Sequence, residues 1–143
     1  MTGLTRHADA RWEGDLVSGK GTMRTESGAY EGQYTFTTRF GQERGTNPEE
    51  LLAAAHAGCF SMSFAARCVK NNFTVNSIET KASLTVEKKE EGFRVTTIVL
   101  DCVADVPDIS DEQLNELALD AKVNCPVSAA LSSADITLNL TRA

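Results

Sequence analysis

The 143-residue sequence predicts an α+β fold in a single domain covering residues 1–143. Three observations support this. The first forty residues alternate between apolar and polar side chains, a stretch almost free of charge then begins with helix-start residues, and two further alternating runs follow it. A domain of this size buries roughly 70% of the surface of its unfolded chain. Its 41% hydrophobic and 24% charged residues exclude disordered and collagen-like proteins.

The first forty residues are expected to form strands joined by glycine-containing turns. Apolar and charged residues alternate over residues 10–13, and the aromatic residues Tyr34, Phe36 and Phe40 alternate with threonines and Arg39. This alternation predicts a strand that continues to Phe40. Arg39 would then lie on the face opposite the aromatic row, at the end of the strand.

A long helix is predicted from Pro48 to about residue 70. Asn47 suits the N-cap, Pro48 suits the first helical position, and Glu50 stands where a capping-box acid returns a hydrogen bond. Two asparagines follow the helix and suit its end. Because its residues are apolar or small on all sides, we expect a central, buried helix.

The second half of the chain is predicted to alternate between strands and short helices. Residues 78–86 alternate in polarity and form a hairpin with residues 93–104. A helix over residues 110–123, a second helical piece over 126–132 and a closing strand over 136–140 follow. The strands are expected to be antiparallel.

Charge and hydropathy limit the partners of the chain. The net charge is −6, and residues 101–120 carry seven acids with no lysine or arginine, so a nucleic-acid partner is not expected. The longest charge-free run covers 16 residues, 51–66, and is shorter than the roughly 20 apolar residues of a membrane span. The N-terminus lacks an apolar run. We therefore expect a cytoplasmic protein without membrane insertion, whose cysteines are reduced at rest.

Two of the four cysteines stand at helical positions. Cys59 lies in the charge-free helix, where burial raises the pKa of a thiol, and Cys125 stands 66 residues later, directly before Pro126, near an expected helix start. The positive end of a helix dipole favours a thiolate there, although a small buried side chain is the plainer interpretation of Cys125 alone. Cys68 lies half a turn around the helix from Cys59, so the two cannot pair. We interpret Cys68 and Cys102 as bystanders.

Other kinds of site are not indicated. The sequence has no CxxC or HxxxH spacing, and its two histidines, His7 and His56, belong to no ligand set, so no metal is expected. We interpret His56 as a helix residue with a satisfied side chain or as a pocket wall. Hydrolase and phosphate-loop patterns are absent from the sequence.

Residues 45–62 (GTNPEELLAAAHAGCFSM) and 124–128 (NCPVS) closely resemble the osmotically inducible protein C (OsmC) family. Together with the related organic hydroperoxide resistance proteins, members of that family are thiol peroxidases. The likeness extends over nearly the whole chain and is nearest to the OsmC branch, in which the site arginine follows the aromatic strand, as Arg39 does here. It implies an intertwined homodimer with curved antiparallel β-sheets wrapped around two central helices.

The same resemblance implies a catalytic site. Cys59 would be the peroxidatic cysteine, Cys125 the resolving cysteine, and Arg39 with Glu49 an ion pair at each of two sites on the dimer interface. Without the resemblance, Arg39 is a solvated strand-end cation and Glu49 a first-turn acid favoured by the helix dipole. An organic hydroperoxide is the implied substrate and a dithiol, such as a lipoyl protein, the reductant; no cofactor is implied. Apolar residues near the thiol suggest a substrate pocket of Leu51, Leu52, Phe60 and Met62.

The helix spacing indicates a site shared by two chains. Glu49 and Cys59 are ten residues apart and therefore about 15 Å apart along one helix. One Arg39 cannot bind the carboxylate and also reach that chain's own sulfur, so we expect Glu49 and Arg39 to come from the partner. The alternative function is a stress-induced protein that binds apolar ligands and senses oxidation through its thiols.

Overall fold

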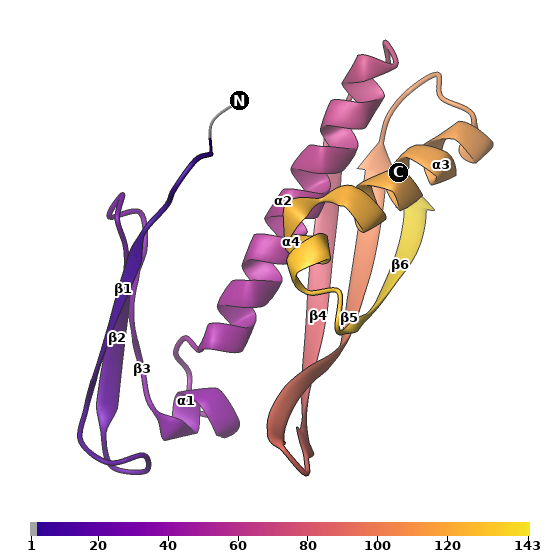
Figure 1. The fold of residues 1–143 in the computed structure, drawn as a ribbon. Coiled ribbons are helices and arrows are strands. Elements are labelled where there is room, and N and C mark those ends of the chain that lie inside the picture. The colour runs from indigo at the N-terminus through magenta and orange to yellow at the C-terminus, as the bar shows by residue number, and fades with distance from the viewer. Residues whose placement is uncertain (1–2) are drawn as a thin grey trace. The chain divides into compact units, whose positions relative to one another are not determined.

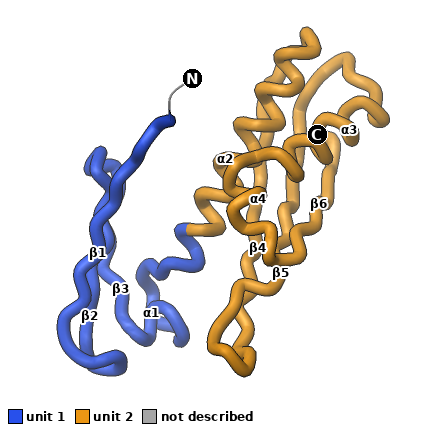
Figure 2. Tube along the Cα trace, viewed as in Figure 1, with its two compact units in different colours: residues 1–51 blue, residues 52–143 orange. Residues whose placement is uncertain are grey.

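The computed structural model describes residues 3–143, which form two compact units (Figure 2). The first ends at Leu51 and the second is Leu52–Ala143. We describe each by itself, and the single domain over residues 1–143 stays a prediction. The mixture of strands and helices confirms the α+β class (Figure 1).

The first unit contains a three-stranded antiparallel sheet of β1 (Ala8–Glu13), β2 (Lys20–Thr25) and β3 (Glu31–Tyr34), in that order. Gly21 in the middle strand pairs with Trp12 on one side and Tyr34 on the other. A Cβ at Gly21 would lie 2.6–2.7 Å from both aromatic rings, whose centroids are 5.4 Å apart. Glycine thus lets the two rings meet over the sheet.

The prediction that a strand continues to Phe40 is wrong, because residues Phe36–Phe40 form a short helix, α1. Thr35 caps it: its hydroxyl accepts the Thr38 N–H at 3.2 Å, and the Thr38 hydroxyl accepts the Thr35 N–H at 2.9 Å. Phe36 and Phe40, four residues apart, share one helix face, with ring centroids 5.2 Å apart. A spacing of four fits both a strand and a helix, so the aromatic pattern could not distinguish them.

Helix α2 (Pro48–Lys70) is confirmed, and Asn47 caps it by accepting the Glu50 N–H at 2.8 Å. The expected burial on all sides is not what the single chain shows. One stripe is fully buried, His56, Phe60, Phe64 and Cys68, at the four-residue spacing of a helix face. Other positions are open, including Met62, which is 78% exposed. Helix α2 is long and apolar enough to cross a membrane. This is weak evidence for a membrane span, because core helices of soluble proteins meet the same test.

The second unit contains the hairpin of β4 (Ser77–Lys89) and β5 (Gly92–Asp105), which is confirmed as antiparallel. The closing strand β6 (Asp135–Arg142) pairs with β5 in parallel, so the expectation of antiparallel strands is wrong for this pair. The chain leaves β5, passes through α3 (Asp111–Asn124) and α4 (Pro126–Ala130), and returns in the same direction. A helical crossover of this kind is the usual connection between parallel strands.

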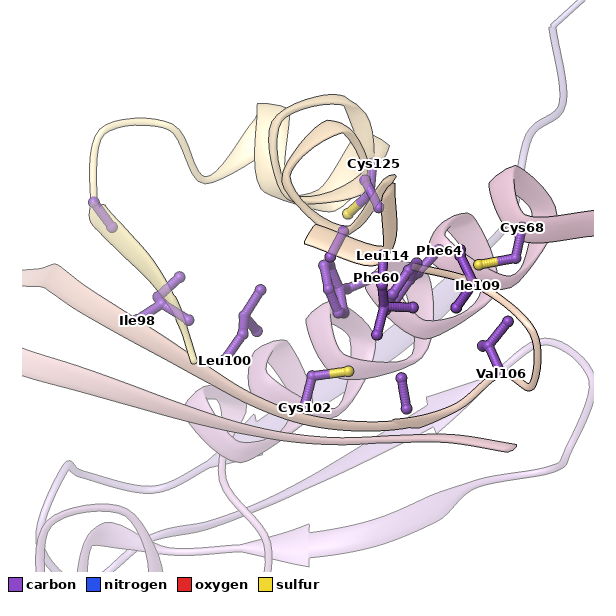
Figure 3. Packing of buried hydrophobic residues seen from close by; sticks show 14 residues of the cluster. Phe60, Phe64, Cys68, Ile98, Leu100, Cys102, Val106, Ile109, Leu114 and Cys125 are labelled. Carbon is purple, nitrogen blue, oxygen red and sulfur yellow. The ribbon is translucent and has the colours of Figure 1, made fainter. Parts of the chain in front are cut away.

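The core of the second unit lies between its sheet and its helices (Figure 3). Strand β5 buries every second residue, Ile98, Leu100, Cys102 and Ala104. Phe60 and Phe64 of α2 and Leu114 of α3 pack with that row. Cys68 and Cys102 are buried members of this core, in agreement with their interpretation as bystanders.

Candidate functional site

The structure brings Cys59 and Cys125 together within the second unit. The thiol of Cys59 interacts with the thiol of Cys125 and with the backbone of Val127, and all four cysteines are free. Cys59 projects from α2, whereas Cys125 stands at the corner where α3 ends and α4 begins. Sixty-six residues of sequence therefore separate two thiols that lie next to each other in space.

Of the two interpretations of Cys125, the plainer one describes its burial. Although Cys125 stands at a helix start, its side chain is fully buried beside Phe60 and Leu114 (Figure 3). Cys59 is only partly buried. The α3–α4 corner packs against the core, and this packing encloses Cys125 although it is an N-cap residue.

The two thiols differ in how readily they ionise. Burial raises the pKa of Cys59, and the neighbouring Cys125 raises it further. Burial also acts to raise the pKa of Cys125, but hydrogen bonds to Ser128 and Cys59 outweigh it and place that pKa below its usual value. The Ser128 N–H donates to the Cys125 sulfur at 3.3 Å, as at the free N-terminus of a helix. In the single chain, Cys125 is therefore the more acidic thiol.

A buried polar chain continues from Cys125 and was not predicted from the sequence. The Cys125 thiol donates to the Ser128 hydroxyl at 3.3 Å, and His56 Nε2 lies 2.7 Å from the same hydroxyl. His56 is fully buried, which lowers its pKa, and its Nδ1 has no partner among the described residues. A signal was present, since His56 precedes Cys59 by three residues and Ser128 follows Cys125 by three, the spacing of one helix face.

Arg39 and Glu49 form the expected ion pair within the first unit. Arg39 Nε and Nη2 donate to Glu49 Oε1 at 2.9 and 2.7 Å, and Nε also lies 3.2 Å from Oε2. The pair joins the end of α1 to the first turn of α2, and the Asn47 amide binds the Thr38 carbonyl at 3.2 Å beside it. Placing Arg39 on a strand was wrong, but its partner was identified. The role of the pair at Cys59 stays a prediction.

A cavity of about 230 Å³ opens beside Arg39 in the first unit. It is lined by Arg39, Thr35 and apolar side chains: Trp12, Leu16, Tyr34, Phe36 and Phe40. The Arg39 guanidinium carbon lies 5.1 Å from the centre of the Phe40 ring, within the range of a cation–π contact. An apolar cavity with one permanent cation on its wall suits a ligand that has an apolar body and a polar end.

The pocket expected from the sequence is not formed by its four residues in the single chain. Phe60 is fully buried in the core and Met62 is largely exposed. Leu51 lines a different cavity with residues of β1 and β2, and Leu52 is exposed. Phe60 was misplaced because its helix position falls on the buried stripe, which is set by the packing of the sheet. Among residues 3–143, no three metal-ligating side chains come together.

Comparison with known proteins places the chain in a family. The sequence pattern of the OsmC-like proteins matches residues 41–141. The chain is 45% identical over 137 residues to the peroxiredoxin OsmC of Escherichia coli, covering 95% of each chain. The chain belongs to the OsmC family. The resemblance drawn from the two cysteine motifs is thus confirmed.

More distant relatives share the fold. The organic hydroperoxide resistance protein OhrB of Bacillus subtilis is 32% identical over 100 residues, which are 68% of this chain and 71% of OhrB. Its crystal structure matches with a TM-score of 0.71 at 25% identity, over 94% of this chain and 98% of OhrB. An OsmC-like protein of Vibrio cholerae matches with a TM-score of 0.78 at 19% identity, over 96% and 99% of the two chains.

Proposed function

We propose that the protein is a thiol peroxidase that reduces organic hydroperoxides through Cys59 and Cys125. Its relatives in the OsmC family support peroxidase activity, because one is named a peroxiredoxin and another an organic hydroperoxide resistance protein. The observation that carries the residue-level proposal is that two free thiols are neighbours, one of them partly exposed and the other buried.

The chemistry begins with the Cys59 thiolate attacking the O–O bond of the hydroperoxide. The alkoxide leaves, takes a proton and becomes an alcohol, and the remaining oxygen stays on Cys59 as a sulfenic acid. Cys125 then attacks the Cys59 sulfur, water is released, and a Cys59–Cys125 disulfide forms. A dithiol reduces this disulfide by exchange. Because Cys125 is a close neighbour of Cys59, the disulfide can close before further oxidation of Cys59.

The difference in burial supports the assignment of the two roles. A hydroperoxide must reach the peroxidatic sulfur, and Cys59 is the more exposed thiol of the pair. The resolving sulfur needs only to reach Cys59, so full burial of Cys125 suits that role. We assign Cys59 as peroxidatic and Cys125 as resolving on these grounds.

Cys59 needs a cation to ionise, because burial raises its pKa and the more acidic Cys125 lies beside it. We propose that Arg39, oriented by Glu49, supplies this cation from the partner of a homodimer. Glu49 and Cys59 are about 15 Å apart along α2, so a single chain cannot place both at one site. The exposed Met62 on α2 supports a dimer, because a second copy would cover that apolar face.

The cavity beside Arg39 supports an organic substrate. Its aromatic wall can bind the apolar part of a hydroperoxide while the guanidinium faces the peroxide oxygens. Hydrogen peroxide has no apolar part and gains nothing from that wall. For the reductant we propose a dithiol such as a lipoyl protein, and for the location the cytoplasm, where thiols are kept reduced.

A turnover assay tests this function. The purified protein is given cumene hydroperoxide or hydrogen peroxide, with dihydrolipoamide or glutathione as reductant, and peroxide consumption is followed. We expect continuous turnover with the organic hydroperoxide and the dithiol, loss of turnover in Cys59→Ser, and retention of it in the control Cys68→Ala, which changes a core thiol. Oxidation that stops after one equivalent would contradict a peroxidase and support the alternative, an apolar-ligand-binding protein with redox-sensing thiols.

A further inference from the structure

His56 and Ser128 form a buried polar chain to Cys125 that the reaction described above does not use. His56 is on α2 and Ser128 on α4, yet the ring nitrogen and the hydroxyl are 2.7 Å apart. The Ser128 hydroxyl is also 3.3 Å from the Cys125 sulfur. Both residues are almost completely buried, so these contacts are shielded from water. A buried hydrogen-bonded chain that ends on a reactive sulfur suggests proton transfer.

We propose that Cys125, Ser128 and His56 form a proton relay, in which the buried imidazole takes the Cys125 proton through the Ser128 hydroxyl as Cys125 attacks oxidised Cys59. This inference rests on the proposed function, because it concerns the step that closes the disulfide. Ser128 touches the reacting sulfur and is the catalytic residue of the relay. His56 acts through Ser128 and is a positioning residue.

The proton balance of the step is complete. The Cys125 S–H gives its proton to Ser128 Oγ, and the Ser128 hydroxyl gives its own to His56 Nε2. The Cys125 sulfur forms a bond to the Cys59 sulfur while the S–O bond of the sulfenic acid breaks and hydroxide leaves. The sulfenic sulfur is reduced and the Cys125 sulfur oxidised to the disulfide level. The imidazolium then returns its proton to the hydroxide, giving water.

The same sulfur, oxygen and nitrogen atoms form the hydrogen-bonded chain from Cys125 to His56 before and after the proton is transferred. With a Cys125 thiol, the S–H donates to Ser128 Oγ, whose hydroxyl donates to a bare His56 Nε2. After transfer, Nε2–H donates to Ser128 Oγ, and the hydroxyl donates to the thiolate. Burial lowers the pKa of His56, so the ring is neutral at rest and does not hold the proton after hydroxide leaves. The unpartnered Nδ1 leaves the ring without a second hydrogen bond among the described residues.

Few other groups can set the protonation of Cys125. Within the described residues of the second unit, Cys59 is the one titratable group that shifts the pKa of Cys125, and burial alone shifts that of His56. In the proposed dimer, the partner's Arg39 would add a cation on the Cys59 side of the pair. Ser128 contacts the Cys125 sulfur directly and His56 acts on it through Ser128, so their effect is separable by mutation from that of the cation.

The first test measures the Cys125 thiol without any need for peroxidase activity. In a Cys59→Ser parent, the ¹³Cβ shift of Cys125 is titrated by NMR, alone and with Ser128→Ala or His56→Gln added. Loss of the Ser128 hydroxyl should raise the Cys125 pKa by about one unit, the tenfold effect of one hydrogen bond to an ionised group. The control is Ser61→Ala. Ser61 lies on the same helix as His56, and its partly buried hydroxyl forms a hydrogen bond with the Thr80 hydroxyl at 2.7 Å, which the substitution removes.

The second test measures disulfide closure in chains that retain Cys59. One equivalent of cumene hydroperoxide is added, and sulfenic acid and disulfide are followed by rapid quenching and intact mass spectrometry. Ser128→Ala and His56→Gln should form the sulfenic acid at the wild-type rate but close the disulfide about tenfold more slowly near neutral pH. The deficit should shrink at high pH, where Cys125 ionises without help. Glutamine at position 56 can still hydrogen-bond Ser128 but cannot take a proton, so it should not rescue closure.

Two results would overturn the relay: closure in both variants at the rate of Ser61→Ala, or closure slowed by one factor at every pH with the Cys125 pKa unchanged. The second pattern would mean that His56 and Ser128 only pack the α3–α4 corner. Failure of the wild type to form a sulfenic acid would refute the proposed function instead, and the NMR titration would still decide the relay. Circular dichroism of each variant checks that it is folded.

Discussion

Arg39 binds Glu49 through two of its nitrogens, with Nε and Nη2 at 2.9 and 2.7 Å from the same carboxylate oxygen. The Arg39 side chain is 39% exposed and that of Glu49 20%. An exposed ion pair contributes little to stability, about 1 kcal/mol or less. Arg39 also lines the aromatic cavity, and we expect its contact with Glu49 to orient the guanidinium there.

Arg39→Lys should impair the enzyme although it keeps the positive charge. Lysine lacks the planar fork, so it cannot bind Glu49 with two nitrogens and also face the site. We expect the kcat/KM for cumene hydroperoxide to fall at least about tenfold, with a higher pKa for the Cys59 thiol. Arg11→Lys is the matched control, because Arg11 forms an exposed pair with Glu13 at 3.0 Å. Equal activity in the two variants would remove Arg39 from the mechanism.

Cys59→Ser and Cys125→Ser should fail in different ways. Without Cys59, no sulfenic acid should form and peroxide should not be consumed. Without Cys125, Cys59 should still form a sulfenic acid that dimedone traps, and excess peroxide should convert it to the sulfinic acid because no resolving thiol is present. Mass spectrometry of the trapped peptides identifies the modified residue. A stable sulfenic acid on Cys125 in the wild type would reverse the two roles.

The aromatic cavity should determine the preference for organic substrates. Phe40→Ala removes part of its wall, and an apolar contact equivalent to two methylene groups is worth about 1.6 kcal/mol. The kcat/KM for cumene hydroperoxide should therefore fall about tenfold while that for hydrogen peroxide stays unchanged. Val17→Ala, which alters an exposed residue outside the cavity, is the control. A parallel loss with both peroxides would show that Phe40 acts on Arg39 and not on the substrate.

The sequence predicted those parts of the fold that depend on local signals. Helix α2 was identified because Asn47 and Pro48 are cap residues, and the β4–β5 hairpin because its polarity alternates. Helix α1 was missed because the spacing of Phe36 and Phe40 suits both a strand and a helix. The threonine cap that favours the helix consists of only two hydrogen bonds, which the alternation of side chains does not reveal. The parallel pairing of β6 depends on how the chain crosses the sheet, which its own pattern does not contain.

The candidate site divides in the same way. Cys59, Cys125, Arg39 and Glu49 were proposed as site residues because they stand in motifs that resemble a known family, and their roles stay predictions. The His56–Ser128 contact spans 72 residues and forms only when α4 packs against α2, so the three-residue spacing of each residue from its cysteine could not show that the two meet. The burial of Cys125 is likewise a property of the packed core, because its place before Pro126 left both a thiolate at a helix start and a small buried side chain open.

Each site should need two chains, and mixed dimers can show it. Cys59→Ser and Glu49→Ala are each expected to be inactive as homodimers. If Glu49 acts on the partner's sulfur, a heterodimer has one site with both defects and one site with neither. Mixing the two variants under conditions of subunit exchange should then restore up to about half of the wild-type activity per heterodimer. Exchange is confirmed by native mass spectrometry of differently tagged chains.

Recovery should be absent when Cys59→Ser is mixed with Cys125→Ser, because both residues act at the site of their own chain and each heterodimer site keeps one defect. Proven exchange without recovery in the first mixture would refute a site shared between two chains.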